Sequence, residues 1–74
     1  MEKTLSIFNK ITIDTYKNLW NKFPEREKEF MIYLDMLGVS PSAYFTLRYR
    51  QRLGKFLKLA VATLVRDLNL ENEI

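Results

Sequence analysis

LDMLGVSPSAYFTLRYRQRLGKF, residues 34–56, contains a sharp turn between two runs of helical periodicity. Gly38 closes the first run, and glycine placed directly after a helix adopts a left-handed backbone at little cost. Ser40 is suited to accept a hydrogen bond from the free amides of a helix start, and Pro41 is suited to the first helical position. The stretch therefore predicts a helix, a tight turn at Gly38–Pro41 and a second helix.

The helix predicted after this turn has an apolar side and a basic side when its residues are drawn at about 100° per residue. The apolar side carries Tyr49, Leu53, Phe56, Leu57, Ala60, Val61, Leu64 and Leu68, and Arg50 also projects there. The basic side carries Arg48, Gln51, Arg52, Lys55, Lys58, Ala62 and Arg66, and Tyr44 and Leu59 also project there. We expect this helix to start at Ser40 and continue to about Leu68, with Gly54 as the place where it can bend.

Two further helices are predicted before the turn. The first is indicated by apolar residues at three- and four-residue spacing, namely Ile13, Tyr16, Leu19, Trp20 and Phe23. Thr12 or Asp14 is suited to cap it, and Pro24 ends it because proline disfavours helical geometry in the preceding residue. The next helix begins at Pro24, has carboxylates in its first turns and ends at Gly38. Its expected buried stripe is Phe30, Met31, Tyr33, Leu34 and Leu37.

The predicted fold class is all-α, a small three- to four-helix bundle with a helix-turn-helix-like turn at Gly38–Pro41. We expect one helical domain over residues 1–74, because a chain of this length makes a single core. Residues 1–12 are expected to form an irregular arm or a short strand, and residues 69–74 a frayed tail. Most aromatic residues are predicted to lie in the core, in particular Trp20, Phe23, Phe30, Tyr33 and Phe56.

The composition argues against catalysis and against a membrane anchor. The chain has no cysteine and no histidine, which removes thiolates, imidazole bases and the usual zinc ligands. Its two glycines form no phosphate-binding loop. The N-terminus lacks the features of a signal peptide, and the apolar run at residues 59–65 is too short to span a bilayer. We therefore expect a cytoplasmic protein that is no enzyme and has no metal, no cofactor and no membrane partner.

Positive charge is concentrated in the second half of the chain. Residues 1–38 contain six basic and six acidic residues, whereas residues 39–66 contain six basic residues and no acid. The tail then adds three acidic residues. A basic face of this kind is either simply solvated or a site for phosphates or for an acidic protein.

Residues 37–45, LGVSPSAYF, look like the turn of bacterial and phage helix-turn-helix regulators, in which Gly-Val-Ser precedes the recognition helix. This resemblance implies that DNA would be faced by Ser40, Ser42, Ala43, Thr46 and Arg50. The helix after the turn would then lie in the major groove. The position four residues before the glycine, which is usually small in these families, is Leu34 here.

Residues 23–53 are also similar to ribbon-helix-helix repressors, which have a Pro-Glu helix start and a Gly-x-Ser-x-Ser turn. Gly38-Val39-Ser40-Pro41-Ser42 matches that turn. The resemblance implies that a strand before Pro24 would read DNA in a dimer, although residues 17–23 fit a helix better than a strand.

Two functions are therefore expected. The first is a small homodimeric DNA-binding regulator of transcription or replication, with phosphate contacts from Arg48, Arg50, Arg52, Lys55 and Lys58. The alternative is a helical adaptor or inhibitor that binds an acidic protein through its basic and aromatic surface.

Overall fold

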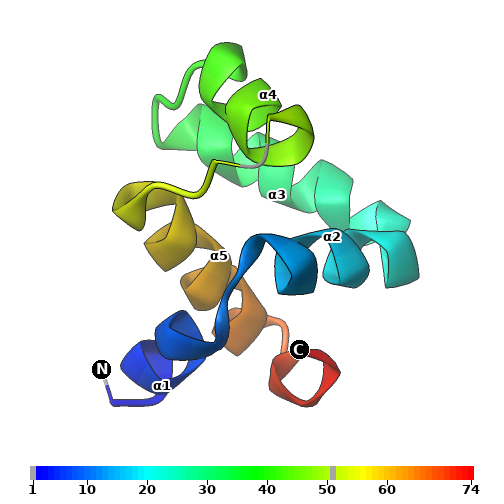
Figure 1. The fold of residues 1–74 in the computed structure, drawn as a ribbon, viewed down its shortest axis with the longest axis vertical. Helices are drawn as coiled ribbons and strands as arrows, with labels where there is room; N and C mark the ends of the chain where they lie inside the picture. Colours follow the sequence, from blue (N-terminus) through cyan, green and yellow to red (C-terminus); the bar gives the residue numbers. More distant parts are fainter. Residues whose placement is uncertain (1, 51) are drawn as a thin grey trace.

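The computed structural model describes residues 2–50 and 52–74. It contains α1 (Glu2–Lys10), α2 (Ile13–Lys22), α3 (Pro24–Met36), α4 (Pro41–Tyr49) and α5 (Lys55–Asp67), followed by a short 3-10 helix (Glu71–Glu73). Figure 1 shows α2 and α3 crossing the middle of the molecule, α4 lying over α3, and α5 running down to α1. The described residues contain no strand, so the prediction of an all-α bundle is confirmed, with more helices than the three or four expected.

The N-terminal segment is a helix, and the expectation of an irregular arm or short strand is wrong. α1 packs against α5 and buries Thr4 and Ile7. The Thr4 hydroxyl lies 2.7 Å from Nη1 of Arg66 on α5 and accepts its hydrogen bond. Short isolated helices are marginal in water. Packing on α5 therefore selects the helix over the strand that the Ile and Thr content favours.

The boundaries of α2 and the start of α3 follow the sequence closely. Thr12 and Thr15 form a reciprocal capping box, in which each side chain accepts a hydrogen bond from the other residue's backbone N–H. Phe23 ends α2, and Pro24 occupies the first turn of α3. The end of α2 and the start of α3 therefore agree with the predicted positions.

The turn between α3 and α4 forms as predicted. Gly38 has φ +76°, and the N–H of Val39 donates to the carbonyl of Leu34 at 2.9 Å, which closes the end of α3. Pro41 is in the first turn of α4. Ser40 stands at the N-cap in extended geometry, but its hydroxyl does not cap the helix and instead lies 2.9 Å from the Ser42 hydroxyl.

The two glycines give a matched test of this turn, because the space that a Cβ would occupy is open at both positions. Gly38→Ala is expected to lower the free energy of unfolding by about 1–2 kcal/mol, since alanine resists a positive φ. Gly54→Ala is expected to change it by less than about 0.5 kcal/mol, because a stiffer unfolded chain offsets a poorer N-cap. Urea denaturation of both variants checks the difference, and equal losses would contradict the role of the left-handed backbone.

The single helix predicted from Ser40 to Leu68 is wrong, because the chain is divided into α4 and α5. Gly54 is the N-cap of α5, with φ −68° and ψ 159°, which is extended backbone. A continuous helix over residues 41–67 would be about 40 Å long, whereas the longest extent of the molecule is 29 Å. The break allows Leu47 of α4 and Leu57 of α5 to reach the same core. Gln51, expected on the basic side of the single helix, lies outside the described residues.

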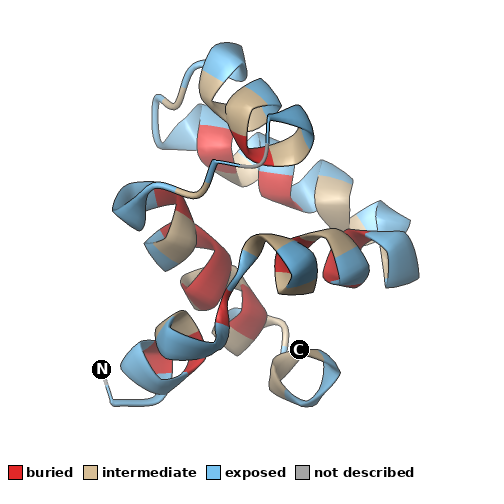
Figure 2. Cartoon of the chain, in the orientation of Figure 1, coloured by how far each residue is buried: buried red, intermediate tan, exposed pale blue. Residues whose placement is uncertain are grey.

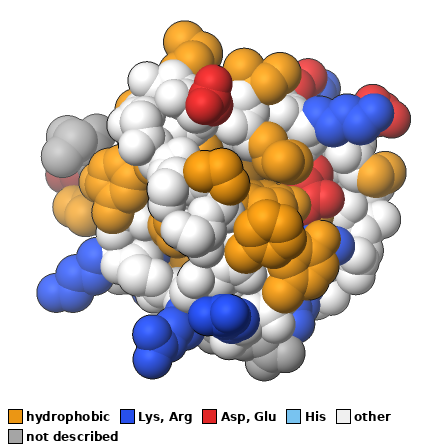
Figure 3. Space-filling model, turned by 90° about the horizontal axis from the view of Figure 1, so that it is seen from above, with side chains coloured by type: hydrophobic (Ala, Val, Ile, Leu, Met, Phe, Trp, Pro, Cys, Tyr) orange, Lys and Arg blue, Asp and Glu red, His pale blue; other side chains and the backbone are white. Residues whose placement is uncertain are grey.

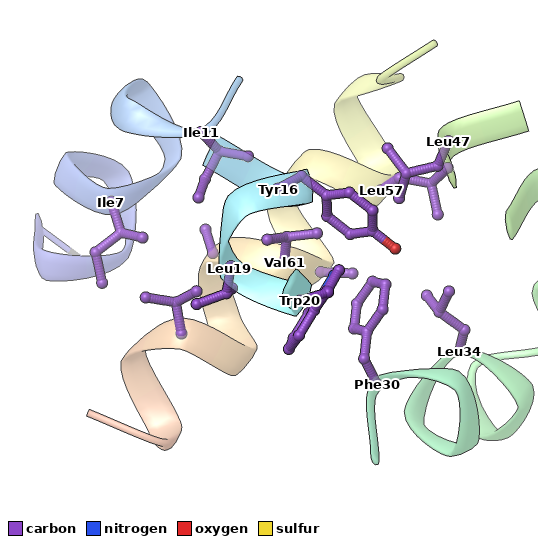
Figure 4. Close-up of a cluster of buried hydrophobic side chains, with 13 residues drawn as sticks. Ile7, Ile11, Tyr16, Leu19, Trp20, Phe30, Leu34, Leu47, Leu57 and Val61 are labelled. Atoms are coloured by element: carbon purple, nitrogen blue, oxygen red, sulfur yellow. The ribbon is translucent and has the colours of Figure 1, made fainter. Parts of the chain in front are cut away.

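The core is centred on three aromatic rings from α2 and α3. The Trp20 ring stacks on Phe30 at a centroid distance of 5.5 Å, and Tyr16 meets both rings edge-on at 5.7 and 5.9 Å. Val61 of α5 lies against this cluster, and the buried residues follow the inward sides of the helices (Figures 2 and 4). Burial raises the pKa of Tyr16 well above its ordinary value.

The predicted aromatic core is only partly correct. Trp20 and Phe30 are buried, and Phe23 and Tyr33 are half-buried against the core. Phe56 is 56% exposed, contrary to prediction. The wheel of one continuous helix placed it inward, but α5 begins only at Lys55 and buries Leu57, Ala60 and Val61 instead.

The end of the chain, expected to fray, makes contacts with the rest of the fold. Leu70 and Ile74 pack against the core, and Glu73 forms an ion pair with Lys22 of α2. Among the described residues, no helix is long and apolar enough to cross a membrane.

Candidate functional site

The helix α4 is anchored by one residue in the core and by two residues that contact α3. Leu47 is fully buried, while Tyr44 and Arg48 are half-buried against α3. The Arg48 Nε lies 3.0 Å from Oε2 of Glu27, and the Tyr44 hydroxyl donates to the same oxygen. These contacts, at Tyr44 and Arg48, fix α4 beside the N-terminal half of α3.

This cluster places Arg48 and Tyr44 against α3, although the sequence predicted both on an exposed basic surface. Arg48 was expected to contact phosphate, but its side chain is only 23% exposed and pairs with Glu27, which is 19% exposed. Tyr44 was expected on the basic surface, but burial and its hydrogen bond to Glu27 raise its pKa well above the ordinary value. The positive charge of Arg48 is thus neutralised within the molecule.

A hollow of about 640 Å³ lies between α3, the turn and α4. Most of its wall is apolar, and its charged lining residues are Glu27, Lys28 and Asp35 of α3. Figure 3, which looks down on this end of the molecule, shows hydrophobic side chains gathered here, with Lys and Arg side chains at several places around the edge. The complete lining is Pro24, Glu27, Lys28, Met31, Leu34, Asp35, Val39, Ser40, Pro41, Tyr44, Phe45 and Tyr49.

Large apolar side chains stand exposed around this hollow. Phe45 and Tyr49 lie one turn apart on the outer side of α4, with ring centroids 5.5 Å apart. Tyr49 is 66% exposed and Met31 is 47% exposed, although the sequence placed both on buried stripes. Tyr49 was assigned inward on the assumption of one long helix, and the end of α4 at Tyr49 removes that constraint.

The remaining predicted contact residues are distributed around α4 and the start of α5. Ser40 and Ser42 are exposed, whereas Ala43 and Thr46 are half-buried, and the Thr46 hydroxyl donates to the Ser42 carbonyl at 2.9 Å. Arg50, Arg52 and Lys55 are exposed, and we call these three residues the basic edge. In the described part of the chain, no carboxylate lies within 4.0 Å of them.

The basic face is therefore shorter than the sequence suggested. The Lys58 ammonium lies over the Phe8 ring at 4.5 Å, which ties it to α1. Arg66 pairs with Asp67 at 2.9 Å and donates to Thr4. Of the six basic residues, only those of the basic edge remain free of such contacts within the described residues.

Four residues that matter for the hollow were not singled out as site residues from the sequence: Glu27, Met31, Asp35 and Phe45. The spacing of Phe45 and Tyr49 was a usable signal, because aromatic residues four apart lie on one side of a helix. Residues 2–50 and 52–74 contain no group of three or more acidic, His or Cys residues placed to hold a metal ion.

Comparison with known proteins adds no relative: no protein-family model, no curated protein and no solved structure matches this chain.

Proposed function

We propose that this protein is a small helical adaptor that binds a partner protein through the hollow between α3 and α4. The observation that carries the proposal is the group of exposed apolar side chains, Met31, Phe45 and Tyr49, around a recess of about 640 Å³. Aromatic and Met side chains beside a recess are enriched at the centres of protein interfaces. An exposed apolar patch of this kind is unfavourable in water until it is covered.

The surface of α4 supports protein binding better than base recognition. Its outward side chains include the aromatic rings of Phe45 and Tyr49. The cation of α4, Arg48, is already paired with Glu27. Base edges are read by hydrogen-bonding side chains such as Arg, Asn and Gln. Exposed Phe45 and Tyr49 supply apolar contact area instead.

Met31 and Ile32 provide a matched pair for the test, since both are exposed neighbours on α3 and only Met31 lines the hollow. Met31→Glu is expected to weaken partner binding about 100-fold or more, because a carboxylate would be desolvated inside the interface. Ile32→Glu is expected to leave it within about twofold. The measurement is an affinity capture from nuclease-treated lysate of the source cells, followed by titration of the partner recovered in stoichiometric amount. Equal behaviour of the two variants would contradict the proposal.

A second candidate is the DNA-binding regulator that the turn sequence resembles. It is favoured by the exposed basic edge of Arg50, Arg52 and Lys55, which lies just after α4. Cations at such an edge can neutralise phosphates and release counterions.

This candidate predicts that Arg52→Glu with Lys55→Glu lowers affinity for duplex DNA and reduces the slope of log affinity against log salt by about two. The control is Lys10→Glu with Lys17→Glu, which changes the net charge equally but lies on α1 and α2. Gel shifts across a salt series would measure both. If the two double variants bind alike, the basic edge has no specific role in DNA binding.

A further inference from the structure

The hollow lies between a stripe of side chains on α3 and a stripe on α4, and we call it the trench. One wall is a stripe of α3 formed by Lys28, Met31 and Asp35, which are three and then four residues apart. The other is a stripe of α4 formed by Pro41, Phe45 and Tyr49, each four residues apart. Residues at these spacings share one side of a helix. A trench between two helices is the form that receives a third helix along its apolar side.

The floor of the trench is fixed rather than adaptable. Leu34 is buried and Val39 is half-buried against the core. Tyr44 and Arg48 both contact Glu27, so the spacing of the two walls is set by a hydrogen bond and an ion pair. A partner therefore meets a preformed recess and does not have to order it.

The rim of the trench is polarised in charge. Lys28 and Asp35 are exposed at either side of Met31, about 10.5 Å apart along α3 at 1.5 Å per residue. The third charged lining residue, Glu27, is already neutralised by Arg48. Glu25 lies 3.9 Å from Lys28, but both side chains are highly exposed, and such pairs contribute little. One end of the trench is thus positive and the other negative.

From these features, and resting on the proposed function, we propose that the occupant of the trench is one amphipathic helix of the partner protein. Its apolar side lies on Met31, Phe45 and Tyr49. An acidic residue meets Lys28, and a basic residue two turns away meets Asp35. A nucleic acid or an anionic lipid surface offers only negative charge and would meet Asp35 unfavourably.

The test is a selection from a displayed library of helices about 18 residues long, roughly five turns, with randomised apolar and charged positions. Wild-type protein is expected to enrich helices that carry an acidic and a basic residue about seven positions apart on either side of the apolar stripe. Met31→Glu is expected to weaken the selected helices at least about tenfold, and Ile32→Glu by less than about twofold, in fluorescence anisotropy.

The orientation of the bound helix gives a second readout, because non-specific hydrophobic binding would not fix one orientation. The chain contains no cysteine, so Met36→Cys, at a highly exposed position outside the trench near Asp35, accepts a single nitroxide label. The label is expected to broaden NMR signals from the basic end of the bound helix. In a variant with Lys28→Glu and Asp35→Lys, it is expected to broaden the acidic end instead.

Several results would overturn the inference. These are enrichment of extended or uniformly charged peptides, an unchanged orientation in the swapped variant, or a dimer in light scattering that Met31→Glu dissociates. The last result would place a second copy of this chain in the trench. If the library fails while capture from lysate still depends on Met31, the adaptor function stands and only the helical occupant is wrong. If capture from lysate does not depend on Met31, the proposed adaptor function is contradicted, whatever the library selection gives.

Discussion

Phe30→Ala is expected to lower the free energy of unfolding by about 3–5 kcal/mol, the largest effect of any substitution considered for this chain. The side chain is fully buried, stacks on Trp20 and meets Tyr16 edge-on. Its removal leaves a cavity between α2 and α3, and Trp20 and Tyr16 each lose their contact with the Phe30 ring. A domain of this size has a total free energy of unfolding of only about 4–11 kcal/mol, so the variant would lose a large part of its stability.

Urea denaturation followed by tryptophan fluorescence measures this loss, because Trp20 is the single tryptophan and lies in the same cluster. The control is Phe56→Ala, which removes the same ring from an exposed position on α5. It is expected to cost less than about 1 kcal/mol. Similar losses for both variants would mean that the aromatic cluster of α2 and α3 is not the centre of the core.

Arg48→Ala is expected to lower the free energy of unfolding by about 2–3 kcal/mol. The guanidinium is the ion-pair partner of Glu27 at 3.0 Å, and both side chains are largely covered. Truncation leaves the Glu27 carboxylate in a poorly solvated place, where the Tyr44 hydroxyl is its remaining side-chain donor among the described residues. Because α4 is held on α3 by these contacts, the variant is also expected to bind ligands of the hollow more weakly.

A second substitution separates the lost charge pair from lost packing. Adding Glu27→Gln to Arg48→Ala is expected to restore about 1 kcal/mol, since a neutral amide still accepts from Tyr44 and carries no unpaired charge. Arg52→Ala, at an exposed site of the basic edge, is expected to change stability by less than about 0.5 kcal/mol. If Arg48→Ala is as mild as Arg52→Ala, the pair with Glu27 does not anchor α4, and Arg48 is available to a phosphate after all.

The local signals in the sequence predicted α2, α3 and the turn accurately. Thr12, Pro24 and Gly38 act on the backbone within a few residues of their own positions. Capping, a fixed proline φ and a positive glycine φ do not depend on distant partners. The buried aromatic pair Trp20 and Phe30 was likewise accessible from periodicity.

The candidate site was only partly predictable. The basic residues of the second half were visible, but their partners lie elsewhere in the chain: Arg48 pairs with Glu27, Lys58 covers Phe8, and Arg66 binds Thr4. A count of charges along one helix contains no information about carboxylates or rings on another. For this reason, only the three residues of the basic edge are free of such contacts in the described part of the second half.

By itself, the sequence determined that this chain is helical, where α2, α3 and the α3–α4 turn begin and end, and that the excess positive charge follows Gly38. Only the tertiary structure decided that residues 2–10 are a helix, that the chain breaks between α4 and α5, and that Tyr49 and Met31 face outward. The physical reason is that these features follow from fitting all helices around one small core. A helix of about 40 Å does not fit in a molecule 29 Å long, and α1 is stable only where α5 covers it.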